Sequence, residues 1–87
     1  MAIAEISIVP VGTKDPSYGG FVEAAVEACA SAGVRRQVGA LSTLLEGDVD
    51  AILACARRMH QAVIAAGADR VVTHLALEER IDDPVAP

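Results

Sequence analysis

The stretch TLLEGDVDAILACARRMHQAVIAAG, residues 43–67, decides the fold. It begins with residues that favour a strand, 43–46, and Gly47-Asp48 then interrupts the strand. Asp48 is the expected N-cap of a helix that continues to about Ala66, and Gly67 is typical of the position after a helix. The apolar residues that recur at helical spacing, which we expect to be buried, are Val49, Ile52, Leu53, Ala56, Met59, Ala62 and Val63. The stretch therefore predicts a strand that leads directly into an amphipathic helix.

The sequence before this unit predicts two further strands and a further helix. Residues 2–11 are rich in β-favouring side chains, and residues 34–40 form a strand that a short turn joins to the next one. Residues 21–32 carry apolar side chains at helical spacing and are followed by a glycine. Residues 12–20 are rich in turn formers, and they form either a plain connection or a flap beside a ligand site.

The last predicted strand covers residues 69–77, which completes the order β-α-β-β-α-β. This is the split βαβ arrangement of the ferredoxin-like fold. The expected architecture is α+β, with a four-stranded antiparallel sheet in the order 4-1-3-2 and two helices on one face. We expect residues 1–87 to form a single domain, with residues 81–87 as a flexible tail.

One face of the predicted sheet has no helix to cover it. In the first strand, Ala4 and Ile6 point towards the helices, whereas Ile3, Glu5 and Ser7 point the other way. The chain has 87 residues, of which 53% are hydrophobic, and a mean hydropathy of +0.41. Because so small a globule buries little of that apolar surface alone, we expect a homodimer or homotetramer that covers the uncovered face.

Charge and composition exclude several classes of function. The net charge is −5 and aromatic residues make up 2%, so a nucleic-acid partner is not expected. A membrane partner is not expected either, since no apolar run approaches a spanning length and the N-terminus lacks a basic region. We therefore expect a cytoplasmic protein in which Cys29 and Cys55, which match no zinc spacing, stay reduced.

The side chains that could act in catalysis show no recognisable arrangement of nucleophile, base and acid. No metal or cofactor site is expected. The histidines, His60 and His74, are far apart in sequence and stand on different elements. His60 lies beside the apolar stripe of its helix and is better explained as a buried, hydrogen-bonded histidine than as a ligand. We therefore expect a protein that is not an enzyme, and the alternative is a small enzyme with one of these histidines as base.

Several segments together resemble the small thiamine-binding proteins related to YkoF. The segments are EISIVPVGT at 5–13, LLEGDVD at 44–50, His60 within its helix, GADRVVT at 67–73, and Arg80 with Asp82. The sequence departs from the family where ALST, residues 40–43, replaces Pro-Met-Gly-Thr, and where Arg36 replaces an aromatic residue before Gln37. The resemblance implies a non-catalytic protein of ferredoxin-like fold that binds thiamine or its hydroxymethylpyrimidine part near a subunit boundary, in dimers of dimers.

An aminopyrimidine needs a carboxylate or carbonyl acceptor together with a hydroxyl or amide donor, and a thiazolium cation favours an acidic site. The residues we expect to bind the ligand are Glu5, Ser7, Gln37, Thr43, Glu46 and His74. Glu5, Ser7, Thr43 and His74 cluster on one surface if they share the same orientation in the sheet.

Four of the six candidates also have a purely structural explanation. Glu5 is otherwise a solvated residue or the partner in an intersubunit ion pair, and Ser7 a small packing residue. Glu46 precedes a helix and can act on its dipole, and His74 can belong to an interface. The alternative function is an oligomeric regulatory module that binds another small effector or a protein partner.

Overall fold

A computed structural model gives the structure of the chain, and it describes residues 1–11, 33–39 and 41–82. The elements in these residues are β1 (Ala2–Val11), β2 (Arg35–Val38), β3 (Thr43–Gly47), α2 (Val49–Ala65) and β4 (Arg70–Glu79). The expected loop at 12–20, the expected helix at 21–32 and most of the expected tail lie outside the described residues.

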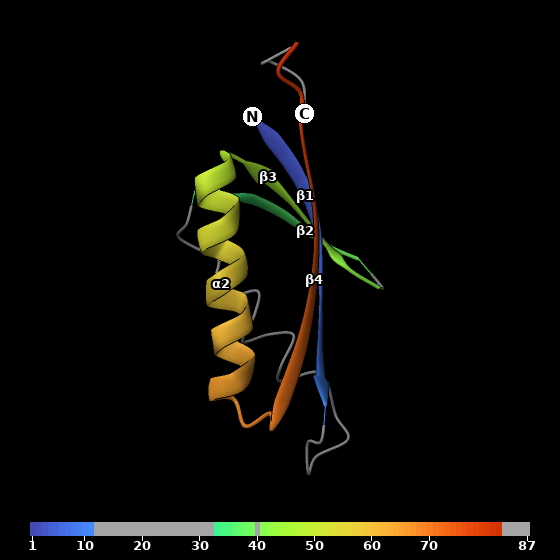
Figure 1. Cartoon of the computed structure of the whole chain (residues 1–87), viewed down its shortest axis with the longest axis vertical. Helices are drawn as coiled ribbons and strands as arrows, with labels where there is room; N and C mark the ends of the chain where they lie inside the picture. The colour runs from blue at the N-terminus through green and yellow to red at the C-terminus, as the bar shows by residue number, and fades with distance from the viewer. Residues whose placement is uncertain (12–32, 40, 83–87) are drawn as a thin grey trace.

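The strands form a four-stranded antiparallel sheet in the order β2-β3-β1-β4, with β1 and β3 in the middle. Read from the β4 edge, these neighbours are the ones of the expected order 4-1-3-2. Figure 1 shows α2 lying along one face of the sheet. The α+β class and the sheet are therefore as predicted, and the expected layer of two helices is confirmed for α2 alone.

The predicted strand at 34–40 is longer than β2, which covers Arg35–Val38. The backbone N–H of Gly39 donates to the carbonyl of Ser42 at 2.8 Å, so the chain already turns here and the ladder ends at the pair Val38 and Thr43. Conversely, β4 extends to Glu79, two residues beyond the predicted end, because it stays paired with β1 as far as Ala2.

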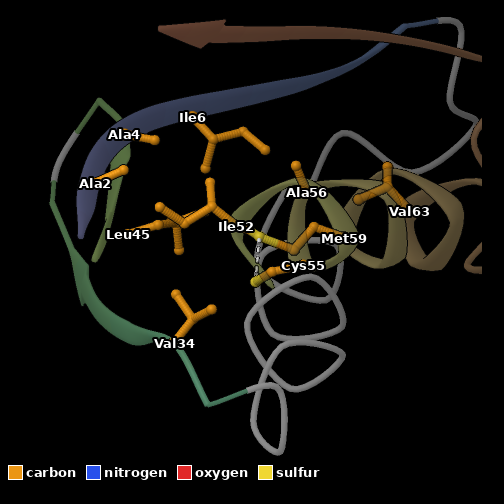
Figure 2. Packing of buried hydrophobic residues seen from close by; sticks show 10 residues of the cluster. All are labelled: Ala2, Ala4, Ile6, Val34, Leu45, Ile52, Cys55, Ala56, Met59 and Val63. Atoms are coloured by element: carbon orange, nitrogen blue, oxygen red, sulfur yellow. Dashed lines mark hydrogen bonds between the residues drawn. The ribbon is translucent and has the colours of Figure 1, made fainter. Parts of the chain in front are cut away.

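The core lies between the sheet and α2. Leu45 and Ile52 are fully buried, and Ile6 and Val63 are 1% exposed. Figure 2 shows the small side chains of Ala2 and Ala4 on the β1 side of this cluster, facing the larger ones of α2. Alternation along β1 places every second residue in the core, as the sequence predicts.

The buried stripe of α2 differs from the prediction at two positions. Leu53 was expected in the core but is 45% exposed, whereas Cys55, which the prediction left out, is fully buried. One helical residue turns by about 100°, so the position after Ile52 lies at the side of the helix. Asp48 is the N-cap residue as predicted; its carbonyl accepts from the N–H of Ile52, but its side chain makes no capping hydrogen bond.

The expectation of a reduced thiol is wrong for Cys55, which is disulfide-bonded in the structure. That expectation rested on sequence spacing, and spacing does not report which side chains meet in space. The Sγ atom of Cys55 lies 3.9 Å from the Sδ atom of Met59 (Figure 2). Because a disulfide sulfur carries no hydrogen to donate, this is a packing contact.

Candidate functional site

The face of the sheet opposite α2 carries a row of residues centred on Glu5. Glu5 is directly opposite Leu44 of β3 on one side and Ala76 of β4 on the other, and Leu44 is in turn opposite Gln37 of β2. Neighbouring strands are about 4.8 Å apart, so the row brings the Glu5 carboxylate and the Gln37 amide within about 10 Å along the sheet. Glu5 is exposed, and the small side chain of Ala76 leaves space beside it.

The next row pairs two more of the predicted site residues. Ser7 of β1 is directly opposite His74 of β4, on the same face as Glu5. Residues two apart in a strand are about 6.7 Å apart, so Ser7 and Glu5 reach one small molecule together. No hydrogen bond joins Ser7 to His74 in the described part of the chain, and His74 is exposed. These polar groups are accessible to a ligand.

The third row holds Glu46, but its carboxylate already has a charged neighbour. Glu46 is opposite Ile3 of β1 and Arg35 of β2, and its Oε2 lies 3.8 Å from Nη1 of Arg35. The side chain of Arg35 is 85% exposed, so the ion pair is worth about 1 kcal/mol or less. The structure therefore puts Glu46 on the candidate face, at its end and engaged with a guanidinium.

Thr43 does not join the other candidates. It pairs with Ile6, points towards α2 and is 8% exposed. The expected cluster of Thr43 with Glu5, Ser7 and His74 is therefore wrong in its geometry. Side chains alternate along a strand, and Leu44 occupies the outward position beside Glu5 instead.

The other histidine belongs to the covered side of the sheet. The Nδ1 atom of His60 is 2.6 Å from Oγ1 of Thr73, a hydrogen bond that connects α2 to β4 in a half-buried setting. The predicted hydrogen bond of His60 is thus confirmed, whereas the side chain is half-buried and not buried as predicted. Among the described residues, no group of three His, Cys, Asp or Glu side chains could hold a metal ion.

Sequence reasoning placed Ile3 and Val72 on the candidate face but missed Leu44. Ile3, Leu44 and Val72 are half-buried there, around the polar groups of Glu5 and Ser7. A flat heterocycle can lie on such apolar side chains while its edge hydrogen-bonds to the polar ones. The alternation of side chains along β3, in which Leu45 is buried, was the signal that could have located Leu44.

The candidate site is a sheet face of an α+β domain on which polar side chains, among them Glu5 and Ser7, stand among apolar ones. The family model described as "Thiamine-binding protein" matches residues 4–86, and the chain belongs to that family. The resemblance found in the sequence is thereby confirmed. Among the described residues, no helix has the length and apolar character to cross a membrane.

Curated relatives cover nearly the whole chain. A UPF0045 protein of Methanothermobacter thermautotrophicus is 40% identical over 83 residues, which are 94% of this chain and 84% of the relative. The UPF0045 protein YqgV of Bacillus subtilis is 31% identical over 86 residues, which are 94% of this chain and 83% of the relative.

Solved structures share the fold. A domain of Bacillus cereus named DUF77 has a TM-score of 0.82 at 35% identity, covering 91% of this chain and 75% of that one. A protein of Methanocaldococcus jannaschii has a TM-score of 0.85 at 35% identity, and the match covers 94% of this chain and 82% of that one. A putative thiamine biosynthesis/salvage protein of Thermotoga maritima has a TM-score of 0.78, covering 93% and 85%, and at 22% identity it supports the fold alone.

Proposed function

We propose that this protein binds thiamine or its hydroxymethylpyrimidine moiety on the open sheet face, without making or breaking a bond. The observation that carries the proposal is the position of Glu5 at the centre of that face, beside the half-buried Leu44 and the small Ala76. Membership of the thiamine-binding family supports the choice of ligand. The biological role is carriage, buffering or sensing.

The polar groups of the face match the edge of an aminopyrimidine. The carboxylate of Glu5 accepts a hydrogen bond from the exocyclic amino group, and Ser7 or the amide of Gln37 donates to a ring nitrogen. His74, directly opposite Ser7, can act as donor or acceptor according to its tautomer. A net charge of −5 also favours the thiazolium cation.

A second copy of the chain completes the site. The sheet covers only one face of a bound ring, and a ligand pocket normally buries most of its ligand. Exposed apolar residues on the same sheet face, such as Val9 at 45% exposure, favour cover by a sister subunit. We therefore propose a homodimer or homotetramer in which the ligand lies at a subunit boundary.

Isothermal titration calorimetry tests this function directly. Thiamine, its phosphates and hydroxymethylpyrimidine are titrated into the parent protein and into the Glu5→Gln variant. The substitution keeps the size of the side chain but removes the charged acceptor, so we expect the affinity to fall about tenfold or more. Absence of binding heat for every ligand at millimolar concentration would rule out the function and favour the regulatory alternative.

Two matched variants serve as controls. Glu79→Gln makes the same chemical change on β4 at a position whose side chain lies on the other face of the sheet, opposite Ala2. Thr43→Val removes the hydroxyl of the candidate that faces α2. Both should bind as the parent does. An equal loss of ligand affinity in Glu79→Gln and Glu5→Gln would mean that the overall charge of the protein, and not this face, attracts the ligand.

A further inference from the structure

The two sides of Glu5 on the open sheet face differ in the size of the neighbouring side chain. On the β3 side Glu5 is directly opposite Leu44, which is half-buried and fills its position. On the β4 side Glu5 is directly opposite Ala76, whose side chain is a single methyl group. Directly opposite residues have Cα atoms about 4.5–5.5 Å apart, so the β4 side leaves room for a flat ring beside the Glu5 carboxylate.

Larger side chains surround Ala76 on this face. On β4 the residues two positions away, His74 and Glu78, are both exposed and point the same way. On β1 the diagonal neighbours of Ala76 are Ile3 and Ser7. We call the surface over Ala76 that these four side chains bound the Ala76 seat. The seat combines an apolar floor with polar groups at its sides.

The carboxylates beside the Ala76 seat have no counter-charge, unlike the one on the β3 side. Ile3 is directly opposite Glu78 of β4 and Glu46 of β3. Glu46 is paired with Arg35 at 3.8 Å. In the part of the chain that the structure describes, neither Glu5 nor Glu78 forms a hydrogen bond or an ion pair. These two are diagonal neighbours with Cα atoms about 7–8 Å apart, so both carboxylates attract a cation that lies near Ile3.

We propose, resting on the function proposed above, that the ligand lies in the Ala76 seat and that Glu78 is the residue that selects a cationic ligand. The exocyclic amino group of the pyrimidine donates to Glu5, and Ser7 donates to a ring nitrogen. A single carbon joins the thiazolium to the pyrimidine, and the next row of the sheet is about 6.7 Å away. The thiazolium therefore lies over Ile3, beside the carboxylate of Glu78.

The reverse orientation of the ligand is less favourable. It would direct the thiazolium along β4 towards the row that Ser7 and His74 form. That row carries no carboxylate, and a protonated imidazole would repel the cation. Glu5 lies between the two rows and attracts the thiazolium in either orientation. The difference between the two orientations therefore comes from Glu78 at one end of the seat and His74 at the other.

Isothermal titration calorimetry with two ligands tests the role of Glu78. Thiamine carries the cationic ring and hydroxymethylpyrimidine does not, so the ratio of their affinities reports the selection of charge. Glu78→Gln keeps the size of the side chain. We expect it to lower the affinity for thiamine about fivefold, less so at high salt, and to leave the affinity for hydroxymethylpyrimidine unchanged. If Glu78→Gln lowered neither affinity, or lowered both equally, the inference would be wrong.

Two further acidic positions sharpen this comparison. Glu79→Gln makes the same change one residue along β4, on the other face of the sheet, and should leave both affinities as in the parent. Glu46→Gln removes the other carboxylate that is directly opposite Ile3. Because Arg35 already offsets the charge of Glu46, the loss of thiamine affinity should be smaller than in Glu78→Gln. An equal or larger loss in Glu46→Gln would place the ligand on the β3 side and overturn the inference.

A larger side chain at position 76 tests the seat itself. Ala76→Leu fills the space beside Glu5, so we expect the affinity for both ligands to fall about tenfold or more. Ala65→Leu adds the same volume at an exposed position of α2 and should bind as the parent does. Urea denaturation of each variant shows that it is folded. Binding by folded Ala76→Leu that equals binding by the parent would overturn the seat.

The outcomes for this inference and for the proposed function can be told apart. If the parent binds both ligands and Glu78→Gln and Ala76→Leu bind them equally well, the Ala76 seat is rejected and the proposed function stands. If the parent binds neither ligand, the proposed function fails, and the inference fails with it.

Discussion

His60 and Thr73 form the one hydrogen bond between side chains of α2 and the sheet in the described part of the chain, at 2.6 Å. We expect His60→Ala and Thr73→Val each to lower the free energy of unfolding by about 1 kcal/mol, since a half-buried hydrogen bond contributes about that much. The double variant should lose little more than either single one, which gives a coupling energy of about 1 kcal/mol in urea denaturation.

A neighbouring exposed residue provides the control for this cycle. Gln61 follows His60 in α2 but is exposed. Gln61→Ala combined with Thr73→Val should therefore be additive. If the losses of unfolding free energy in His60→Ala and Thr73→Val were additive, the two side chains would not stabilise each other in solution.

The orientation of Thr43 was predictable from the sequence but was missed. Thr43 and Glu46 are three residues apart in one strand, so they cannot share a face. Because Leu45 is an obvious core residue and Thr43 is two positions away, the buried orientation of Thr43 follows from the alternation alone. By contrast, the contact between Glu46 and Arg35 depends on the register of two strands, and the turn sets that register locally.

The helix α2 shows how far periodicity determines an element. Its predicted bounds agree with Val49–Ala65 to within one residue, because Asp48 and Gly67 mark its ends. Its core face was harder to predict, since Leu53 is more hydrophobic than Cys55 and only the rotation of the helix against the sheet decides which is buried. That rotation depends on packing against β1 and β3, which no local pattern contains.

Adjacent positions of α2 test this orientation. Ile52 is fully buried and Leu53 is 45% exposed. We expect Ile52→Ala to lower the free energy of unfolding by about 3 kcal/mol, because it leaves a cavity in the core. Leu53→Ala should cost about 1 kcal/mol or less in the same urea titration. Similar losses in the two variants would mean that α2 is rotated relative to the structure.

For the whole molecule, the sequence predicted the α+β class and the strand neighbours because its signals were local and consistent. Alternation in β1, the Gly47-Asp48 break and the β-rich residues of β4 all indicate the same topology. The bonding state of Cys55 could not be predicted, because it depends on which residues meet across the domain. That no described strand pairs with the outer side of β4 likewise becomes visible only when the strand order is known.

An assembly that covers the open sheet face makes the stability of the whole molecule depend on concentration. Association favours the folded state by mass action, so raising the protein concentration 100-fold, from about 2 to about 200 μM, should raise the Tm by about 5 °C. Val9→Lys, which places a charge on that face, should show a smaller rise in the same calorimetric scans, whereas Arg58→Glu on α2 should match the parent. A Tm that is independent of concentration for the parent would mean that the exposed apolar side chains of the open face, such as Val9, stay in contact with water.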